Sequence, residues 1–222
     1  MNYFKTQALL FDMDGTIIDS RAHVDRAWTA WCARHGLALE DVRPFTHGVR
    51  TADTLRRVAP ELDIAAETAW IEALDLGHDG IGVVAGVDRV LASLPDARWA
   101  VVTSAPRALL EARFASCALA LPSAVVSAET VRHGKPSAEP YLQAAEKLGV
   151  DPRDCIVFED APAGMTSALA AGCRVVLVGG LRSADEGVIA CIDDYAQLSL
   201  AVGERCLRVA IPAHCCVAPA TV

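Results

Sequence analysis

Short runs of apolar residues alternate with longer amphipathic stretches along most of the chain. Near-continuous apolar runs of this length are typical of strands buried on both faces of a parallel sheet. The runs lie at 8–11, 99–102, 123–126, 155–158, 174–178 and 188–190. Apolar positions with helical spacing lie between them, at 86–94, 106–117, 138–148 and 161–171. The alternation predicts an α/β fold with a Rossmann-like parallel sheet core and helices on both faces.

The segment from about residue 18 to 83 interrupts this alternation. It contains no convincing strand, and its amphipathic patterns lie near 22–35, 51–59 and 64–77. We therefore expect an inserted helical domain at 18–83 and a core made of 1–17 and 84–203. Gly80, Gly82 and Gly86 are suited to a hinge where the chain returns to the sheet, because glycine tolerates many backbone conformations.

The C-terminal segment 204–222 is less regular, and we treat it as a tail that is either unstructured or packed at an edge of the core. It contains His214, Cys215 and Cys216, but no second ligand cluster with zinc-site spacing is evident. The eight cysteines of the chain are scattered. Most lie in or beside apolar segments, which favours buried thiols in a reducing, cytoplasmic compartment over a disulfide framework.

Composition and charge narrow the possible partners. The 222 residues suffice for one core domain with a small insertion, and 53% of them are apolar. No apolar run is long enough to span a membrane, and the N-terminal run is too short for a signal peptide. The formal net charge is −8, without a basic stripe, so we expect neither a nucleic acid nor a membrane as partner.

Polar residues follow the predicted strands at the points where these end. Each group alone has an ordinary explanation, such as turn formation or helix capping. In parallel sheets, however, ligands bind at the carboxyl ends of the strands, and clustered carboxylates there form an oxygen-rich site suited to Mg²⁺. Hydroxyls and a lysine complete a phosphate pocket. The groups are Asp12 with Asp14, Thr103 with Ser104, Lys135, and Glu159 with Asp160.

The motifs DMDGT, VVTS, GKPSAEPY and VFEDAPAG, in this order, resemble those of the haloacid-dehalogenase superfamily of phosphohydrolases. The resemblance covers roughly residues 7–180. The cap-inserted subfamily, which includes sugar phosphatases and β-phosphoglucomutase, fits best and implies that the insertion is a helical, C1-type cap. The stretch HGVRTADTLRRVAP at 47–60 is similar to the cap of bacterial and yeast sugar-phosphate and glycerol-phosphate phosphatases. The resemblance implies a Mg²⁺-dependent phosphatase for a small phosphorylated metabolite, a sugar or polyol phosphate.

The resemblance also implies roles for the residues at the strand ends. Asp12 is expected to be the nucleophile that forms an aspartyl-phosphate. Asp14 is expected to protonate the leaving oxygen and then to activate water. The remaining residues are expected to bind metal or phosphate. The expected magnesium ligands are Asp12, the backbone carbonyl of Asp14, Asp160 and, directly or through water, Glu159. The residues expected to bind the phosphoryl group are Thr103, Ser104, Lys135 and Gly15 with its loop.

The cap is expected to select the substrate. Its candidates to face the leaving group are Ser20, His47, Gly48, Arg50 and Thr51. His23 is a further candidate, but an ordinary surface histidine is an equally good interpretation of it. Because a cap of this kind covers the active site by itself, we expect a monomer.

Several alternatives to hydrolysis are weakened by single residues. Haloacid dehalogenases lack an acid at the position of Asp14. β-Phosphoglucomutases usually have valine at the position of Thr16 and a cap histidine at that of Val24, and their cap lysine and arginine align with His47 and Thr51. Phosphonate hydrolysis needs a cap lysine, and none occurs between Lys5 and Lys135. A silent phosphate-binding or interaction protein remains an alternative, although every expected catalytic position is filled.

Overall fold

The computed structural model describes residues 1–76 and 80–217. A six-stranded sheet forms the centre of the core, in the order β6-β5-β2-β7-β8-β9, and all its neighbouring strands are parallel. The strands are β2 (Ala8–Phe11), β5 (Trp99–Val102), β6 (Ala124–Val126), β7 (Cys155–Glu159), β8 (Arg174–Val178) and β9 (Val188–Ile192). Each contains or overlaps one of the predicted apolar runs, so the predicted parallel sheet is confirmed.

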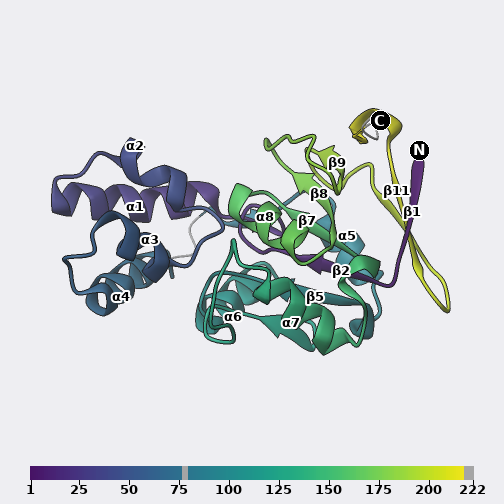
Figure 1. Ribbon diagram of the computed structural model, residues 1–222, viewed down its shortest axis with the longest axis horizontal. Helices are drawn as coiled ribbons and strands as arrows, with labels where there is room; N and C mark the ends of the chain where they lie inside the picture. The colour runs from purple at the N-terminus through teal and green to yellow at the C-terminus, as the bar shows by residue number, and fades with distance from the viewer. Residues whose placement is uncertain (77–79, 218–222) are drawn as a thin grey trace.

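Helices cover both faces of this sheet (Figure 1). Along β2, successive side chains point to opposite faces, with Leu9 and Phe11 in one apolar cluster and Ala8 and Leu10 in the other. Helices α5 (Val87–Ala92) and α6 (Arg107–Ser116) pack into the first cluster, and α7 (Glu139–Leu148) and α8 (Pro162–Ala170) into the second. The predicted α/β core with two covered faces is confirmed. Short 3-10 turns precede β5 and β7, at Asp96–Arg98 and Pro152–Asp154.

The inserted segment forms a separate helical lobe, the cap, beside the core (Figure 1). The cap has its own apolar cluster, which includes Trp28, Trp31, Leu55 and Ile71. Its helices are α1 (Arg21–His35), α2 (Leu39–Val42), a 3-10 turn at Arg43–Phe45, α3 (Thr51–Val58) and α4 (Ile64–Asp75). The helical patterns near 22–35, 51–59 and 64–77 therefore predicted helices correctly, although residue 77 lies outside the described residues.

A short antiparallel ribbon joins the cap to the core, and the expectation of no strand in 18–83 was wrong in this respect. Strands β3 (Ile18–Asp19) and β4 (Gly82–Val83) pair with each other at the two ends of the insertion. Two-residue strands are too short to show alternation, so their pairing depends on the tertiary structure that brings the ends together.

Part of the C-terminal segment, residues 207–211, belongs to a second, antiparallel sheet in the order β1-β11-β10. Its strands are β1 (Asn2–Thr6), β10 (Ser199–Val202) and β11 (Leu207–Ile211), and a 3-10 turn follows at Ala213–Cys215. Leu207, Val209 and Ile211 are buried in the core cluster that contains Phe11. Of the two interpretations of the tail, edge packing therefore holds for residues 207–211. The cysteines form no disulfide in the described part of the chain.

Among residues 1–76 and 80–217, no helix combines the length and the apolar character that crossing a membrane requires.

A buried carboxylate joins two helices of the cap. Glu67 of α4 accepts hydrogen bonds from Trp31 Nε1 at 2.9 Å and from His35 Nε2 at 3.0 Å, both from α1. Burial opposes ionisation of Glu67, but these hydrogen bonds and nearby Arg34 outweigh it and lower the pKa of the carboxyl below its usual value. The ionised carboxylate therefore stabilises the folded cap.

We expect Glu67→Gln to lower the thermal midpoint (Tm) at pH 7. Because the folded-state pKa is lowered, the stabilisation is complete above the ordinary glutamate pKa of about 4.3 and disappears as pH falls through the folded-state value. Thermal unfolding followed by circular dichroism, from about pH 3 to about pH 7, measures this. Glu61→Gln, at an exposed cap residue, is the control. An equal Tm difference between wild type and Glu67→Gln at every pH would contradict the assignment.

Candidate active site

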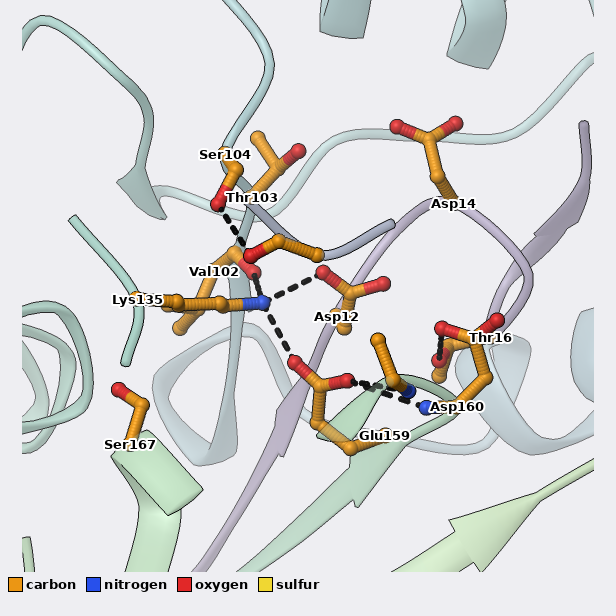
Figure 2. A network of polar contacts seen from close by, with 12 residues as sticks. Asp12, Asp14, Thr16, Val102, Thr103, Ser104, Lys135, Glu159, Asp160 and Ser167 are labelled. Atoms are coloured by element: carbon orange, nitrogen blue, oxygen red, sulfur yellow. Dashed lines mark hydrogen bonds and ion pairs between the residues drawn. The ribbon is translucent and has the colours of Figure 1, made fainter. Parts of the chain in front are cut away.

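The polar groups selected from the sequence converge at one end of the sheet (Figure 2). Strands β5, β2 and β7 are neighbours, so the residues that follow them lie side by side. Asp12 and Asp14 follow β2, Thr103 and Ser104 follow β5, and Glu159 and Asp160 lie at the end of β7. Lys135 comes from the loop between β6 and α7. Parallel strands place their carboxyl ends on the same edge, which explains this convergence.

Lys135 is the centre of a buried network of charges. Its Nζ donates to Asp12 Oδ1 at 2.5 Å, to Glu159 Oε1 at 2.6 Å and to the carbonyl oxygen of Val102 at 3.0 Å. An ammonium has three donors, and all of them are used. Burial alone would favour neutral lysine, but the two carboxylates outweigh it and raise the pKa of Lys135. Lys135 is therefore a permanent cation held against Asp12.

Glu159 fixes the position of this cation. Its Oε1 also accepts a hydrogen bond from Tyr141 Oη at 2.8 Å, and its Oε2 accepts from the backbone N–H groups of Asp160 and Ala161 at 3.1 and 3.2 Å. Both carboxylate oxygens are thus occupied in the described structure. A Cβ at Gly164 would lie 1.7 Å from Glu159 Oε1, so α8 can approach this carboxylate only with glycine there.

Asp12, Glu159 and Asp160 form a cluster suited to a divalent cation. Each offers a ligand oxygen, and these atoms lie within 4.8 Å of one another. Burial, followed by repulsion from Glu159 and Asp14, raises the pKa of Asp12 to about 7 in spite of Lys135. Burial and repulsion from Asp12 and Glu159 likewise raise the pKa of Asp160 well above its usual value. Hard oxygen ligands with uncompensated negative charge fit Mg²⁺.

Asp160 is packed tightly against the loop that follows β2. Thr16 Oγ1 donates to its Oδ1 at 3.5 Å. Gly15 has a φ of +83°, and a Cβ there would lie 1.9 Å from Asp160 Oδ2. Gly15, which was expected to bind substrate, therefore leaves room for the Asp160 carboxylate in this structure.

A cavity, partly open to solvent, lies between the cluster and the cap. On the core side it is lined by Asp12, Asp14, Thr103 and Ser104. Of the cap candidates, His47, Gly48 and Thr51 line it, together with Val24, Trp28, Glu72 and Asp75.

Hydrogen bonds hold two of these cap residues, Gly48 and His47, in place. Ser104 Oγ donates to the carbonyl oxygen of Gly48 at 3.0 Å, which links core and cap directly. His47 Nε2 lies 3.0 Å from Asp25 Oδ1, which orients the imidazole.

Three of the cap candidates, Ser20, Arg50 and His23, lie outside the cavity lining. Ser20 Oγ donates to Asp14 Oδ1 at 2.5 Å, so it contacts the expected acid itself. Arg50 pairs with Asp53 at 2.6 Å and donates to the carbonyl oxygens of Val131 and Arg132, both at 3.3 Å. Arg50 therefore ties the cap to the loop that carries Lys135. His23 lies 3.9 Å from Asp75, an ion-pair distance at the cap base.

Several residues of the site were missed in the sequence. Tyr141 and Gly164 support Glu159. They end the motifs GKPSAEPY and VFEDAPAG, but no role was assigned to them from the sequence. Arg113 is completely buried and contacts Asp14. One signal for Arg113 was available, because it shares the apolar stripe of the predicted helix 106–117 with Leu110 and Phe114, and a charged residue in such a stripe needs a partner.

Comparison with known proteins agrees with this geometry. The haloacid dehalogenase-like hydrolase family matches residues 6–172. Hexitol phosphatase A of Escherichia coli K12 is 42% identical over 180 residues, which cover 78% of this chain and 83% of that enzyme. Glycerol-1-phosphate phosphohydrolase 2 of Saccharomyces cerevisiae is 34% identical over 185 residues, or 78% of this chain and 74% of that enzyme. The chain belongs to the haloacid dehalogenase-like hydrolase family.

Solved structures show the same fold. A mutant of CbbY from Rhodobacter sphaeroides, in complex with xylulose-(1,5)bisphosphate, superposes with a TM-score of 0.73. The similarity covers 87% of this chain and 96% of that one, at 23% sequence identity. The predicted α/β fold is thereby confirmed.

We expect Gly15→Ala to weaken Mg²⁺ binding by about 10- to 100-fold, because the new methyl group would displace Asp160. Isothermal titration calorimetry with MgCl₂ measures this. Gly36→Ala is the matched control, since Gly36 also has a positive φ, +68°, but a Cβ there meets nothing within 4 Å. Both variants carry the same kind of backbone strain, so equal loss of Mg²⁺ affinity in both would contradict the role assigned to Gly15.

Proposed function

We propose that this protein is a Mg²⁺-dependent phosphatase that hydrolyses a sugar phosphate or a polyol phosphate through an aspartyl-phosphate on Asp12. The observation that carries the proposal is the position of Asp12, which lies buried between Lys135 and the other carboxylates and faces the cavity under the cap. The names of the relatives, a hexitol phosphatase and a glycerol-1-phosphate phosphohydrolase, support this class of substrate.

In the first half-reaction, a carboxylate oxygen of Asp12 attacks phosphorus and the bond to the leaving oxygen breaks. Asp14 gives its proton to that oxygen, so the product leaves as a neutral alcohol. In the second half-reaction, Asp14 takes a proton from water, and the resulting hydroxide attacks the aspartyl-phosphate. Orthophosphate leaves and the Asp12 carboxylate is restored. Both half-reactions need Asp14 on the leaving-group side of the cavity, and Asp14 lines that cavity.

Positive charge is needed because an anionic nucleophile attacks an anionic substrate. Lys135 supplies one charge next to Asp12, and the hydroxyl of Thr103 and the backbone N–H of Ser104 are proposed to donate to phosphoryl oxygens. Asp12, Asp160 and the backbone carbonyl of Asp14 would hold Mg²⁺, with Glu159 contributing directly or through water. When bound, Mg²⁺ neutralises charge on the phosphoryl oxygens.

Hydrolysis is favoured over isomerisation of a sugar phosphate. Val24, which occupies the position of the mutase cap histidine, lines the cavity and offers no hydrogen bond to a bisphosphate. The cap candidates that line the cavity, His47, Gly48 and Thr51, are proposed to contact the leaving group. The cap covers the cavity from within one chain, which supports a monomer, and the free thiols support a cytoplasmic location.

We expect the wild-type protein to release orthophosphate from hexitol, deoxyhexose or glycerol phosphates only when Mg²⁺ is present. Phosphate release measured colorimetrically over such a panel, with MgCl₂ or with EDTA, tests this. β-Glucose 1-phosphate belongs in the panel, because its conversion to the 6-phosphate without phosphate release would identify a mutase instead.

Asp12→Asn should lower kcat by about 10⁴-fold or more, since removal of a covalent nucleophile eliminates the reaction path itself. The substitution preserves shape and leaves Lys135 paired with Glu159, so the variant should remain folded, as circular dichroism would show. Substantial activity in a folded Asp12→Asn variant would refute an aspartyl-phosphate mechanism.

A further inference from the structure

A completely buried arginine contacts the proposed acid but has no part in the reaction described above. Arg113 of α6 has 0% exposure. Its Nη1 donates to Asp14 Oδ1, and its Nη2 donates to Asp75 Oδ1 at 2.8 Å. Hydrogen bonds from a guanidinium to carboxylates are charge-assisted and roughly twice as strong as hydrogen bonds between neutral groups.

The contacts of Asp14 use only one of its oxygens. Ser20 Oγ donates at 2.5 Å to the same Oδ1 that Arg113 contacts. No hydrogen bond within the described residues ends on Oδ2, while Asp14 lines the cavity and its side chain is 25% exposed. In Figure 2 the Asp14 carboxylate lies apart from the Lys135 network. One oxygen is anchored, and the other is left for proton exchange with substrate or water.

The second carboxylate on Arg113 comes from the cap. Asp75 is the last residue of α4, and His23 of α1 lies 3.9 Å from it. Arg113 itself belongs to a core helix. Arg113 therefore contacts both Asp14 and Asp75 only when the base of the cap is docked against α6.

Stability alone gives little reason for this arrangement. A buried ion pair contributes little more than apolar residues of the same size, because removal of the charges from water offsets their attraction. Arg113 also leaves its Nε without an acceptor in the described structure. An apolar residue beside Leu110 and Phe114 would pack in the core without this cost. The contact that an apolar residue could not replace is the hydrogen bond to Asp14.

We propose that Arg113 is a positioning residue that orients Asp14 for proton transfer, and that Asp75 couples this orientation to docking of the cap. The inference rests on the proposed phosphatase function and adds to it a residue pair that acts on the leaving group. The inference predicts a difference between substrates. Hydrolysis of a substrate whose leaving oxygen needs a proton should depend on Arg113, and hydrolysis of a substrate whose leaving oxygen needs none should not.

Two leaving groups separate these cases. An alkyl phosphate, such as sorbitol 6-phosphate or glycerol 1-phosphate, releases a strongly basic oxygen that must be protonated. p-Nitrophenyl phosphate releases a stable phenolate that leaves without an acid. The parameter kcat/KM covers only the steps up to departure of the leaving group when that departure is irreversible, so the later role of Asp14 as a base does not affect the comparison.

The experiment measures kcat/KM for the alkyl phosphate that the wild type hydrolyses best and for p-nitrophenyl phosphate, both with saturating Mg²⁺. We expect Arg113→Met to lower the value for the alkyl phosphate by about 100-fold, the usual effect of a misplaced acid, and to change that for p-nitrophenyl phosphate only slightly. Arg113→Lys should recover part of the loss, since an ammonium keeps the charge but lacks the fork that reaches both carboxylates. Asp75→Asn should show the same selectivity with a smaller loss.

Arg107→Met is the matched control. Arg107 lies on the same helix, but it is exposed and pairs with Glu111 at the surface. This variant should leave both values unchanged.

An equal loss on both substrates in a folded Arg113→Met variant, or no loss on the alkyl phosphate, would overturn the inference. If Arg113→Met does not fold, Arg113→Lys and Asp75→Asn decide the matter, and absence of selectivity in both would count against it. If the wild type hydrolyses neither substrate, the proposed function fails first and the inference with it.

Discussion

Repulsion among carboxylates at the carboxyl ends of β2 and β7 constrains the whole site. Asp12, Glu159 and Asp160 offer oxygens within 4.8 Å of one another in a buried position. Such a cluster is stable only with positive charge nearby, and Lys135 provides one part of it. Burial, together with the remaining negative charge, explains the raised pKa values of Asp12 and Asp160, and that charge makes the site suitable for a divalent cation.

Much of the surrounding structure supports these charges. Tyr141 and two backbone N–H groups hold Glu159, which in turn holds Lys135. Gly15 and Gly164 have no side chain because carboxylate oxygens occupy the space where a Cβ would lie. The polar groups at the strand ends are therefore fixed by packing before any substrate binds, and this kind of preorganisation favours catalysis by positioned charges.

The cap adds a second layer of control, because it contacts the core through polar groups near the chemistry. Ser104 binds the carbonyl of Gly48, Arg50 binds the loop before Lys135, and Arg113 joins Asp14 to Asp75. Each contact would change if the cap moved. The fold thus allows the leaving-group pocket and the proposed acid to be assembled together when the cap is docked.

The sequence by itself determined the parallel sheet, its helices and the group of residues around Asp12, because these depend on local periodicity and on the rule that parallel strands end at one edge. Only the tertiary structure decided the rest. Arg113 reaches Asp14 across 99 positions and Asp75 across 38, and β11 pairs with β1 at opposite ends of the chain. No local pattern encodes such contacts, since they form only when parts of the chain that are distant in sequence pack against each other. Arg50 and Gly15 are further examples. The sequence indicated that both belong to the site, but only the tertiary structure shows that Arg50 contacts the loop before Lys135 and that Gly15 lies against Asp160.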